Sequence, residues 1–431
     1  MGLEQRLNDG SAVLGVVGLG YVGLPLVVEM AKAGHKVIGF DVSDDKVEKV
    51  NAGESYIPDV PSAEFAALVK AGLIEATTDF SHVSACDAVS ICVPTPLDEM
   101  KEPDTSYMED VARSVAPFLH ADMLVTLEST TYPGTTEEVI QPILETSGLT
   151  VGDGLYLAFS PERVDPGNPT FQTHNTPKVV GGVTPQCTKH AVALYERFIE
   201  TVVPVSSTRA AEMTKLLENI FRSVNIALMN ELLQLCERMH INLWEVIDAA
   251  KTKPFGFMPF YPGPGLGGHC IPIDPFYLSW KARQYDFRTE FIELSGKVNE
   301  SMPYYVIQRL MDALNMQRKS LADSRILMLG VAYKADIDDM RESPAIRVAE
   351  LLLEKSANIV YHDPWIETFS VLGAEVPSVE LTAEEIAASD AVLVITNHSN
   401  IDYHLVVRSA QLILDTRNAL KAFDDNKVVR L

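Results

Sequence analysis

Residues 13–41 read VLGVVGLGYVGLPLVVEMAKAGHKVIGFD. The apolar run that opens this stretch predicts a buried parallel strand. Three glycines in the spacing GxGxxG follow and lead into a predicted helix, which Gly34 closes. A second apolar run then predicts a strand that ends on Asp41. Strand, glycine turn, helix, strand and acid together predict a dinucleotide-binding α/β domain.

The three glycines and the acid also indicate which cofactor binds. Gly18 makes the tight turn, Gly20 lets the backbone approach a pyrophosphate, and Gly23 lets the helix pack on the strand. The helix N-terminus offers N–H groups and a positive dipole to the phosphates. Asp41 can bind both ribose hydroxyls and repels a 2′-phosphate, so we expect NAD rather than NADP. The alternative is a helix that needs small residues for packing alone.

Length and composition limit the classes of protein. A chain of 431 residues is too long for one core, so we expect two or three domains. No apolar run is long enough to span a membrane, and the first residues lack a secretion signal, which predicts a cytoplasmic protein without a membrane partner. The net charge of −24 argues against nucleic acid as a partner. Five scattered cysteines without a CxxC predict a reducing compartment and no metal site.

Further strands of the first domain end on polar side chains. Apolar runs predict three more strands, followed by Thr95, by Thr130, and by Glu162 with Arg163. In an open parallel sheet the ligand lies beyond the carboxyl ends of the strands, so topology places these side chains near a ligand. The alternative for the threonines is a helix cap.

A long helix is predicted over residues 206–241, because this stretch lacks proline and glycine and repeats apolar residues at helical spacing. So long a helix commonly bridges domains or forms a dimer face. Lys215 and Asn219 are four residues apart and therefore share one face of it. The alternative is a solvated polar stripe.

Residues 261–278 read YPGPGLGGHCIPIDPFYL and contain Cys270 and Asp274. Their glycines and prolines preclude a regular helix or a central strand until Pro275, which suits the first turn of a helix. One interpretation is a connector with a buried cysteine. The other is an active-site loop.

From residue 325 the pattern of strand, glycine, helix, strand and acid recurs, with Gly330 and Asp363 in the places of Gly18 and Asp41. We therefore predict an α/β fold with two Rossmann-like, doubly wound parallel-sheet domains joined by a long central helix. The expected domains are 1–205 (NAD-binding), 206–315 (central, helical, carrying the cysteine loop) and 316–431 (C-terminal).

The second α/β domain has no GxGxxG, so we expect no second dinucleotide there. Lys334, Arg341 and Arg417 instead follow strand ends on one predicted edge. In so acidic a chain, cations at that edge favour a bound phosphate or diphosphate. The alternative is ion pairing with the neighbouring aspartates.

A cysteine near a hydride acceptor predicts covalent chemistry. A thiolate adds to an aldehyde to give a thiohemiacetal, and loss of hydride then gives a thioester that water hydrolyses. Cys270, with Lys215, Asn219 and Asp274 nearby, could thus support oxidation of an alcohol to a carboxylate.

With these motifs in order, the chain resembles the UDP-glucose/GDP-mannose dehydrogenase family of nucleotide-sugar 6-dehydrogenases. The resemblance covers nearly the whole chain, through GLGYVGLPL, ESTTYPGTT, SPERVDPGN, EMTKLLENIFRSVNIALMNEL, GLGGHCIPID, YKADIDDMRESPA and DTRN. It implies oxidation of the C6 alcohol of a UDP-sugar to a uronic acid with two NAD. The sequence of the cysteine loop is similar to that of the branch acting on UDP-N-acetylhexosamines, with UDP-N-acetylglucosamine favoured. The UDP-glucose branch usually has lysine at Ile273 and a small residue at His269. UDP-N-acetylmannosamine and UDP-glucose remain alternatives.

The resemblance also implies roles for individual residues. Cys270 is then the nucleophile, while Lys215 and Asn219 stabilise the developing oxyanion. Asp274 with Thr130 holds water or relays the proton, and Glu162 is the base for thioester hydrolysis. Residues implied to meet the cofactor are Gly18, Gly20, Tyr21, Val22, Gly23, Asp41, Lys46, Thr95, Thr130 and Arg341. Residues implied to meet the UDP-sugar are Glu162, Arg163, Lys215, Asn219, Tyr261, Gly263, Gly267, Tyr333, Lys334 and Arg417. A homodimer through the central helix is also implied, with a higher oligomer open.

Two rival hypotheses remain at this point. A one-step hydroxy-acid dehydrogenase shares the domain plan but does not need Cys270. A non-catalytic nucleotide-sugar sensor would bind both ligands without turnover. The number of NADH formed per sugar separates all three.

Overall fold

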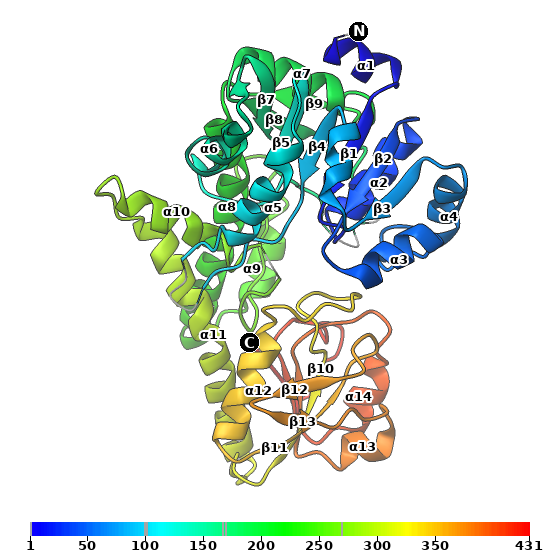
Figure 1. Ribbon diagram of the computed structural model, residues 1–431. Helices are drawn as coiled ribbons and strands as arrows, with labels where there is room; N and C mark the ends of the chain where they lie inside the picture. Colours follow the sequence, from blue (N-terminus) through cyan, green and yellow to red (C-terminus); the bar gives the residue numbers. More distant parts are fainter. Residues whose placement is uncertain (1, 99–101, 166–167, 169, 269) are drawn as a thin grey trace. The chain divides into compact units, whose positions relative to one another are not determined.

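The computed structural model describes residues 2–98, 102–165, 168, 170–268 and 270–431. The chain divides into two compact units (Figure 1). The first contains Met1–Glu218 and Trp280–Phe287, and the second contains Asn219–Ser279 and Arg288–Leu431. The long helix α8 (Thr208–Arg238) is continuous from one unit into the other.

The first unit is built on a nine-stranded sheet in the order β3-β2-β1-β4-β5-β7-β8-β9, with β6 beside β7. Among the strands described, the pairs are parallel except for β7 with β8. Its strands are β1 (Val13–Val17), β2 (Lys36–Phe40), β3 (Ile74–Thr77), β4 (Ala88–Ile91), β5 (Met123–Leu127), β6 (Thr150–Val151), β7 (Gly154–Phe159), β8 (Lys178–Gly182) and β9 (Val202–Pro204).

Helices cover both faces of this sheet, so its central strands are buried and largely apolar. In β5, Leu124 packs in one core while Val125 and Leu127 pack in the other. One face is covered mainly by α1, α2, α4 and α7, and the other by α5 and α6. The helical segments are α1 (Leu3–Asp9), α2 (Gly23–Lys32), α3 (Asp44–Ala52), α4 (Ser62–Lys70), η1 (Phe80–Ala85), α5 (Ser106–Val115), η2 (Ala116–Phe118), η3 (Thr136–Ile140), α6 (Gln141–Leu144), η4 (Glu145–Ser147) and α7 (Pro185–Tyr195).

The second unit contains a five-stranded parallel sheet in the order β11-β10-β14-β15-β16, and a small antiparallel pair, β12 with β13. Its strands are β10 (Arg325–Leu329), β11 (Asn358–His362), β12 (Phe369–Val371), β13 (Ala374–Val376), β14 (Ala391–Val394), β15 (Ile413–Asp415) and β16 (Val428–Arg430). The remaining helices are α9 (Leu243–Ala250), α10 (Asp274–Arg283), α11 (Glu290–Met316), α12 (Pro344–Glu354), α13 (Ala383–Ala387) and α14 (Tyr403–Ser409).

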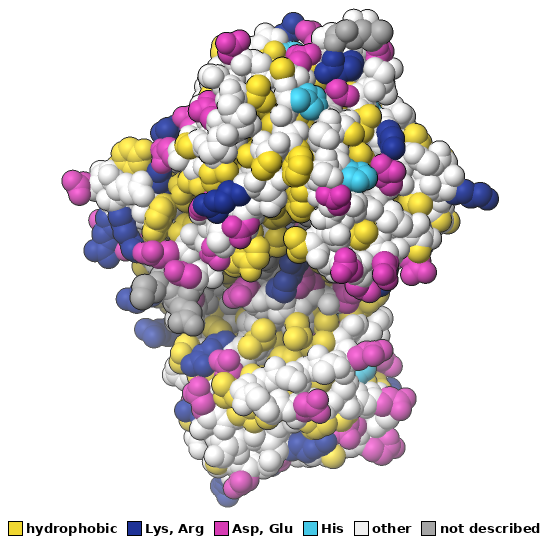
Figure 2. Space-filling view, viewed as in Figure 1, with side chains coloured by type: hydrophobic (Ala, Val, Ile, Leu, Met, Phe, Trp, Pro, Cys, Tyr) yellow, Lys and Arg dark blue, Asp and Glu magenta, His cyan; other side chains and the backbone are white. Residues whose placement is uncertain are grey.

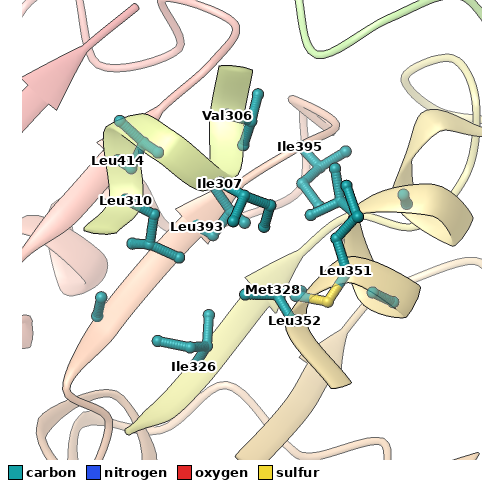
Figure 3. Packing of buried hydrophobic residues seen from close by; sticks show 14 of the residues in the cluster. Val306, Ile307, Leu310, Ile326, Met328, Leu351, Leu352, Leu393, Ile395 and Leu414 are labelled. Atoms are coloured by element: carbon teal, nitrogen blue, oxygen red, sulfur yellow. The ribbon is translucent and has the colours of Figure 1, made fainter. Parts of the chain in front are cut away.

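Helix α11 forms part of the core of this second sheet. Figure 3 shows Ile307 and Leu310 of α11 beside Leu393 of β14, with Met328 of β10 and Leu352 of α12 nearby. All five side chains are buried. The central helices and the C-terminal sheet therefore share one hydrophobic core, which fixes α11 firmly on the sheet.

The two sheets, one parallel and the other parallel except at β7 with β8, and the long helix confirm the α/β, doubly wound architecture that the sequence predicts. Figure 2 shows acidic side chains spread over the visible face among fewer basic ones, in keeping with the net charge of −24. None of the helices in the described part of the chain is both long enough and apolar enough to cross a membrane.

Candidate functional site

The glycine turn between β1 and α2 shows different demands at its three glycines. A Cβ on Gly18, whose φ is +92°, would lie 2.6 Å from the carbonyl oxygen of Cys92. A Cβ on Gly23 would lie 1.8 Å from the carbonyl oxygen of Gly18. A Cβ on Gly20 would meet no protein atom within 4 Å. Gly18 and Gly23 are thus needed for packing, while the space beside Gly20 fits the pyrophosphate of a dinucleotide.

Asp41, directly after β2, is bound to the glycine turn. Its Oδ2 accepts hydrogen bonds from the main-chain N–H of Leu19 at 2.9 Å and from Lys46 Nζ at 3.1 Å. Its Oδ1 accepts from the main-chain N–H of Ser43 at 3.0 Å. The acid is therefore held at the carboxyl edge of the sheet, beside the turn where Tyr21 is half exposed.

Thr95 and Thr130 lie together at the same edge. Thr95 follows β4 and Thr130 follows β5, and these strands are neighbours in the sheet. The Thr95 hydroxyl donates a hydrogen bond to the main-chain oxygen of Thr130 at 2.6 Å. The structure thus brings together two residues that the sequence placed there by strand topology alone.

The loop after β7 is fastened to helix α8 at two points. Lys215 Nζ donates a hydrogen bond to the main-chain oxygen of Glu162 at 2.9 Å. Arg163 forms an ion pair with Glu218, with Nη2 and Oε1 2.6 Å apart. Burial alone would raise the pKa of Glu162, but Lys178, two main-chain N–H groups and Lys215 outweigh burial and lower it. Glu162 is therefore a largely buried carboxylate that remains ionised at neutral pH.

Lys215, Asn219 and Ser223 share a buried face of α8, with exposed fractions of 9%, 3% and 3%. The alternative of a solvated polar stripe is therefore wrong. Asn219 Nδ2 donates to Asp274 Oδ2 at 2.5 Å, and Asn219 Oδ1 accepts from Arg222 Nη2. These two bonds fix the side-chain amide, whose nitrogen carries a second hydrogen for another acceptor.

Cys270 lies four residues before α10 begins at Asp274. Its carbonyl oxygen accepts the main-chain N–H of Asp274 at 2.8 Å and that of Ile273 at 3.2 Å. Cys270 therefore stands one turn before the carboxylate held by Asn219. Pro275 lies in the first turn of this helix, as the sequence predicts. His269 is outside the described residues.

The glycines of the cysteine loop lie against the C-terminal sheet domain. A Cβ on Gly263 would lie 2.5 Å from Arg417 Nη1, and a Cβ on Gly267 would lie 2.6 Å from Tyr333 Cβ. The main-chain N–H of Gly268 donates to the main-chain oxygen of Arg341 at 3.0 Å. Tyr333, Arg417 and the glycine loop, all proposed from the sequence to meet the sugar nucleotide, are thus neighbours within the second unit.

The cations at this edge differ in how they are paired. Arg341 binds Asp339 through Nε and Nη2, at 3.0 and 2.7 Å, so ion pairing accounts for its charge. Arg417 donates from Nε to the main-chain oxygen of Ile395 at 2.8 Å, and the described residues offer it no ion pair. Burial lowers the pKa of Arg417 to about 10, against the opposing effect of Asp415. A desolvated cation of this kind is suited to bind an anion.

Three regions of the chain match one protein family. They are its NAD binding domain over residues 12–199, its central domain over residues 209–301 and its UDP binding domain over residues 327–422. The chain belongs to the UDP-glucose/GDP-mannose dehydrogenase family. This match confirms the resemblance and the NAD cofactor. It also confirms the class of enzyme, an NAD-dependent nucleotide-sugar dehydrogenase.

Relatives within the family carry several substrate names. The chain is 36% identical over 433 residues to the NDP-N-acetyl-D-galactosaminuronic acid dehydrogenase of Ralstonia nicotianae, covering 97% of this chain and 99% of that protein. It is 36% identical over 353 residues to the UDP-N-acetyl-D-glucosamine 6-dehydrogenase of Pseudomonas aeruginosa, covering 81% and 82%. A solved UDP-D-ManNAc dehydrogenase from Pyrococcus horikoshii superposes with a TM-score of 0.89 at 31% identity, covering 97% and 98%.

Sequence reasoning missed a group of buried polar residues behind Glu162. Lys178 forms ion pairs with Glu128 at 2.7 Å and with Glu162 at 3.4 Å. The hydroxyl of Tyr195 donates to Glu128 at 2.6 Å. The sequence carried one signal for this group, a lysine directly before the apolar run VVGG, at a position where a strand would be expected to be buried.

Proposed function

We propose that the enzyme oxidises the C6 hydroxyl of UDP-N-acetylglucosamine to the uronic acid, using two NAD per sugar, for surface polysaccharide precursors. Two observations support a UDP-N-acetylhexosamine as the substrate: the sequence of the cysteine loop and the N-acetylhexosamine names of the relatives. The observation that carries the chemistry is Cys270 one turn before Asp274, whose carboxylate is bound to Asn219. UDP-N-acetylmannosamine, UDP-N-acetylgalactosamine and UDP-glucose are the alternatives that the test must separate.

Substrate binding falls to the second unit in this proposal. The guanidinium of Arg417, which has no ion pair among the described residues, binds the diphosphate, and Tyr333 with the glycines of residues 261–268 bounds the nucleotide and sugar. Lys334, next to Tyr333 in the loop after β10, adds a second cation. The glycine turn and Asp41 hold the cofactor, with Lys46, Thr95 and Arg341 as further contacts. Bound NAD supplies the hydride acceptor for both oxidations.

In the first oxidation, Asp274 and Thr130 take the proton from the C6 hydroxyl, directly or through water. As the C–O bond becomes a carbonyl, the ammonium of Lys215 and the second amide hydrogen of Asn219 stabilise negative charge on its oxygen. Both donors come from the buried face of α8, where exclusion of water strengthens them.

In the second oxidation, the sulfur of Cys270 bonds to the aldehyde carbon and gives a thiohemiacetal. Loss of hydride from that carbon and of the proton from its hydroxyl leaves a thioester. Water then attacks the thioester while Glu162 takes a proton from it, the C–S bond breaks, and Cys270 leaves as thiolate. The products are one carboxylate and a regenerated cysteine.

The assembly that we propose is a cytoplasmic homodimer through α8, with domains 1–205, 206–315 and 316–431. Four large apolar side chains on α8 are roughly half exposed, and their spacing of four and seven residues forms a stripe along one side of the helix: Leu217, Phe221, Leu228 and Leu235. An exposed apolar stripe on a helix commonly binds a second helix of the same kind.

The deciding test measures NADH and product together with four UDP-sugars side by side. UDP-N-acetylglucosamine should give two NADH and one uronate, and faster than its epimers or UDP-glucose. One NADH with a released aldehyde would overturn the four-electron scheme, and binding without NADH would indicate the sensor. Cys270→Ala should still bind both ligands but form no uronate; normal turnover by this variant would refute the covalent route.

A further inference from the structure

A buried chain of polar side chains runs behind Glu162 in the first unit. The Tyr195 hydroxyl donates to Glu128 Oε1 at 2.6 Å, and Glu128 Oε2 lies 2.7 Å from Lys178 Nζ. Lys178 Nζ in turn lies 3.4 Å from Glu162 Oε2. The exposed fractions of the Glu128, Lys178 and Glu162 side chains are 0%, 4% and 14%.

The topology of the sheet explains why a lysine reaches this position. Strand β8 runs antiparallel to β7, with Phe159 opposite Gly181. Continued three residues past the end of β7, this register places Glu162 opposite Lys178. An antiparallel strand thus carries its first residue to the edge where the parallel strands end, which is the ligand edge of such sheets.

The two oxygens of Glu162 have different partners. Oε1 accepts the main-chain N–H of Arg163 at 2.7 Å and that of Val164 at 2.8 Å. Oε2 has Lys178 at the longer distance, because Lys178 is held by Glu128. Oε1 is therefore tied to its own loop, and Oε2, with one longer contact among the described residues, is the less tightly bound oxygen.

We propose that Lys178, held in place by Glu128, is a positioning residue that keeps Glu162 ionised and directs its Oε2 toward the attacking water in thioester hydrolysis. This rests on the proposed role of Glu162 as the base. A purely structural role is a poor alternative, because a buried ion pair seldom stabilises a fold more than apolar side chains of equal volume.

The charges around Glu162 support this assignment. It faces Lys178 of β8, Glu128 after β5 and Lys215 of α8, while Arg163 turns to Glu218. The neutral groups in the same cluster are the Tyr195 hydroxyl and the Cys92 thiol. Burial would lower the pKa of Lys178, but the two carboxylates outweigh it and raise that pKa, so the ammonium persists. Removing it should raise the pKa of Glu162, because burial would then dominate.

The test is single-turnover kinetics of the full-length enzyme with NAD and the UDP-hexosamine that yields NADH. Glu128→Gln with Lys178→Met removes one charge of each sign and keeps an acceptor for Tyr195. We expect thioester formation to change little and hydrolysis to slow about 10-fold at neutral pH, so that intact mass shows an adduct on Cys270. In the pH–rate profile of hydrolysis, the midpoint of the acid limb should move to higher pH by about one unit or more.

Two further variants separate positioning from folding. Lys178→Gln should show the same shifted acid limb, and Lys178→Arg should restore the limb toward that of the native enzyme. Arg6→Met is the matched control: it removes an ion pair with Asp87, 2.7 Å apart, at the amino edge of the same sheet. It should cost stability without an adduct or a shifted limb.

The outcomes distinguish this inference from the proposed function. If Glu162→Gln accumulates the adduct while the Lys178 variants hydrolyse it at the native rate and pH profile, the positioning role is overturned. If Glu162→Gln itself hydrolyses the thioester at the native rate, Glu162 is not the base, and the inference about Lys178 is wrong as well. An adduct in the Arg6→Met control would also overturn it, since any loss of stability would then suffice.

Discussion

The two α/β domains use one local design for different ends. In each, a glycine with positive φ follows the first strand: Gly18 at +92° and Gly330 at +79°. A Cβ would lie 2.6 Å from the oxygen of Cys92 in the first domain and 2.5 Å from that of Thr396 in the second. Both turns therefore exclude a side chain because the neighbouring strand end passes so close.

The domains diverge directly after this turn. Helix α2 begins at Gly23, five residues after Gly18, whereas α12 begins at Pro344, fourteen residues after Gly330. The first domain thus brings a helix N-terminus to the phosphates. The second has a longer loop there, which carries Tyr333 and two cations. This difference indicates that the second domain binds the sugar nucleotide through side chains rather than through a helix N-terminus.

The acid after the second strand has also taken different partners. Asp41 pairs with Lys46, whose side chain is 39% exposed. Asp363 accepts four main-chain N–H bonds and pairs with His398 Nε2 at 3.1 Å, with neither side chain exposed. Asp363 thus binds only groups of its own domain that are buried with it, while Asp41, itself buried, pairs with a lysine whose side chain is partly exposed. The same residue at the same place serves structure in one domain and, we propose, ribose binding in the other.

The largest effect is expected from the contrast between Gly23 and Gly20. In Gly23→Ala the new methyl group would lie 1.8 Å from a carbonyl oxygen, so α2 must move off β1. We expect the free energy of unfolding to fall by about 3 kcal/mol and NADH formation to be lost. Gly20→Ala meets no protein atom, so it should melt like the native enzyme yet bind NAD about 10-fold or more weakly by calorimetry. Equal melting of the two variants would contradict the different roles.

Much of this comparison could be predicted from sequence, because it depends on neighbours in the chain. The glycine turns, the two acids and the start of α10 at the cysteine loop are set within a few residues of one another. Contacts made by distant residues could not be predicted. Glu212 of α8 binds the main-chain N–H of Gly134 and Thr136, and Lys178 reaches Glu162 only because β8 is antiparallel.

The cations of the second domain show the same limit. Arg341 and Arg417 look alike in the sequence, since each follows a strand in the second domain. Their difference is a matter of packing: Arg341 is paired with Asp339, and Arg417 is partly buried without an ion pair in the described part of the chain. Only the three-dimensional structure shows which of the two guanidinium groups has an ion pair among the described residues.

A second, smaller effect is expected from these two arginines. Arg417→Gln removes the partly buried cation at the glycine loop, so the KM for the UDP-sugar should rise about 100-fold, in line with loss of a desolvated charge contact. The KM for NAD should stay within about 2-fold. Arg417→Lys should recover only part of the affinity, because an ammonium cannot bind a diphosphate with two parallel bonds. An unchanged KM for the UDP-sugar in Arg417→Gln would remove Arg417 from the binding site.

The smallest effects, and the most direct test of the comparison, come from the two acids. Asp41→Asn should raise the KM for NAD about 10-fold and lessen the discrimination against NADP, with little change in melting. Asp363→Asn should do the reverse. It should leave the KM for NAD unchanged but lower the free energy of unfolding by about 2 kcal/mol.

The pH dependence of Asp363→Asn provides its internal check. Burial opposes ionisation of Asp363, but His398 and the main-chain N–H groups prevail and lower its pKa from 3.8 to about 2. A carboxylate with a lowered folded-state pKa stabilises the fold above its ordinary pKa, and this contribution is lost as pH falls toward 2. The gap in melting temperature between native enzyme and variant should therefore be full above pH 4 and shrink below it. If Asp363→Asn instead weakens NAD as Asp41→Asn does, the second acid also serves the cofactor, and the contrast between the domains is wrong.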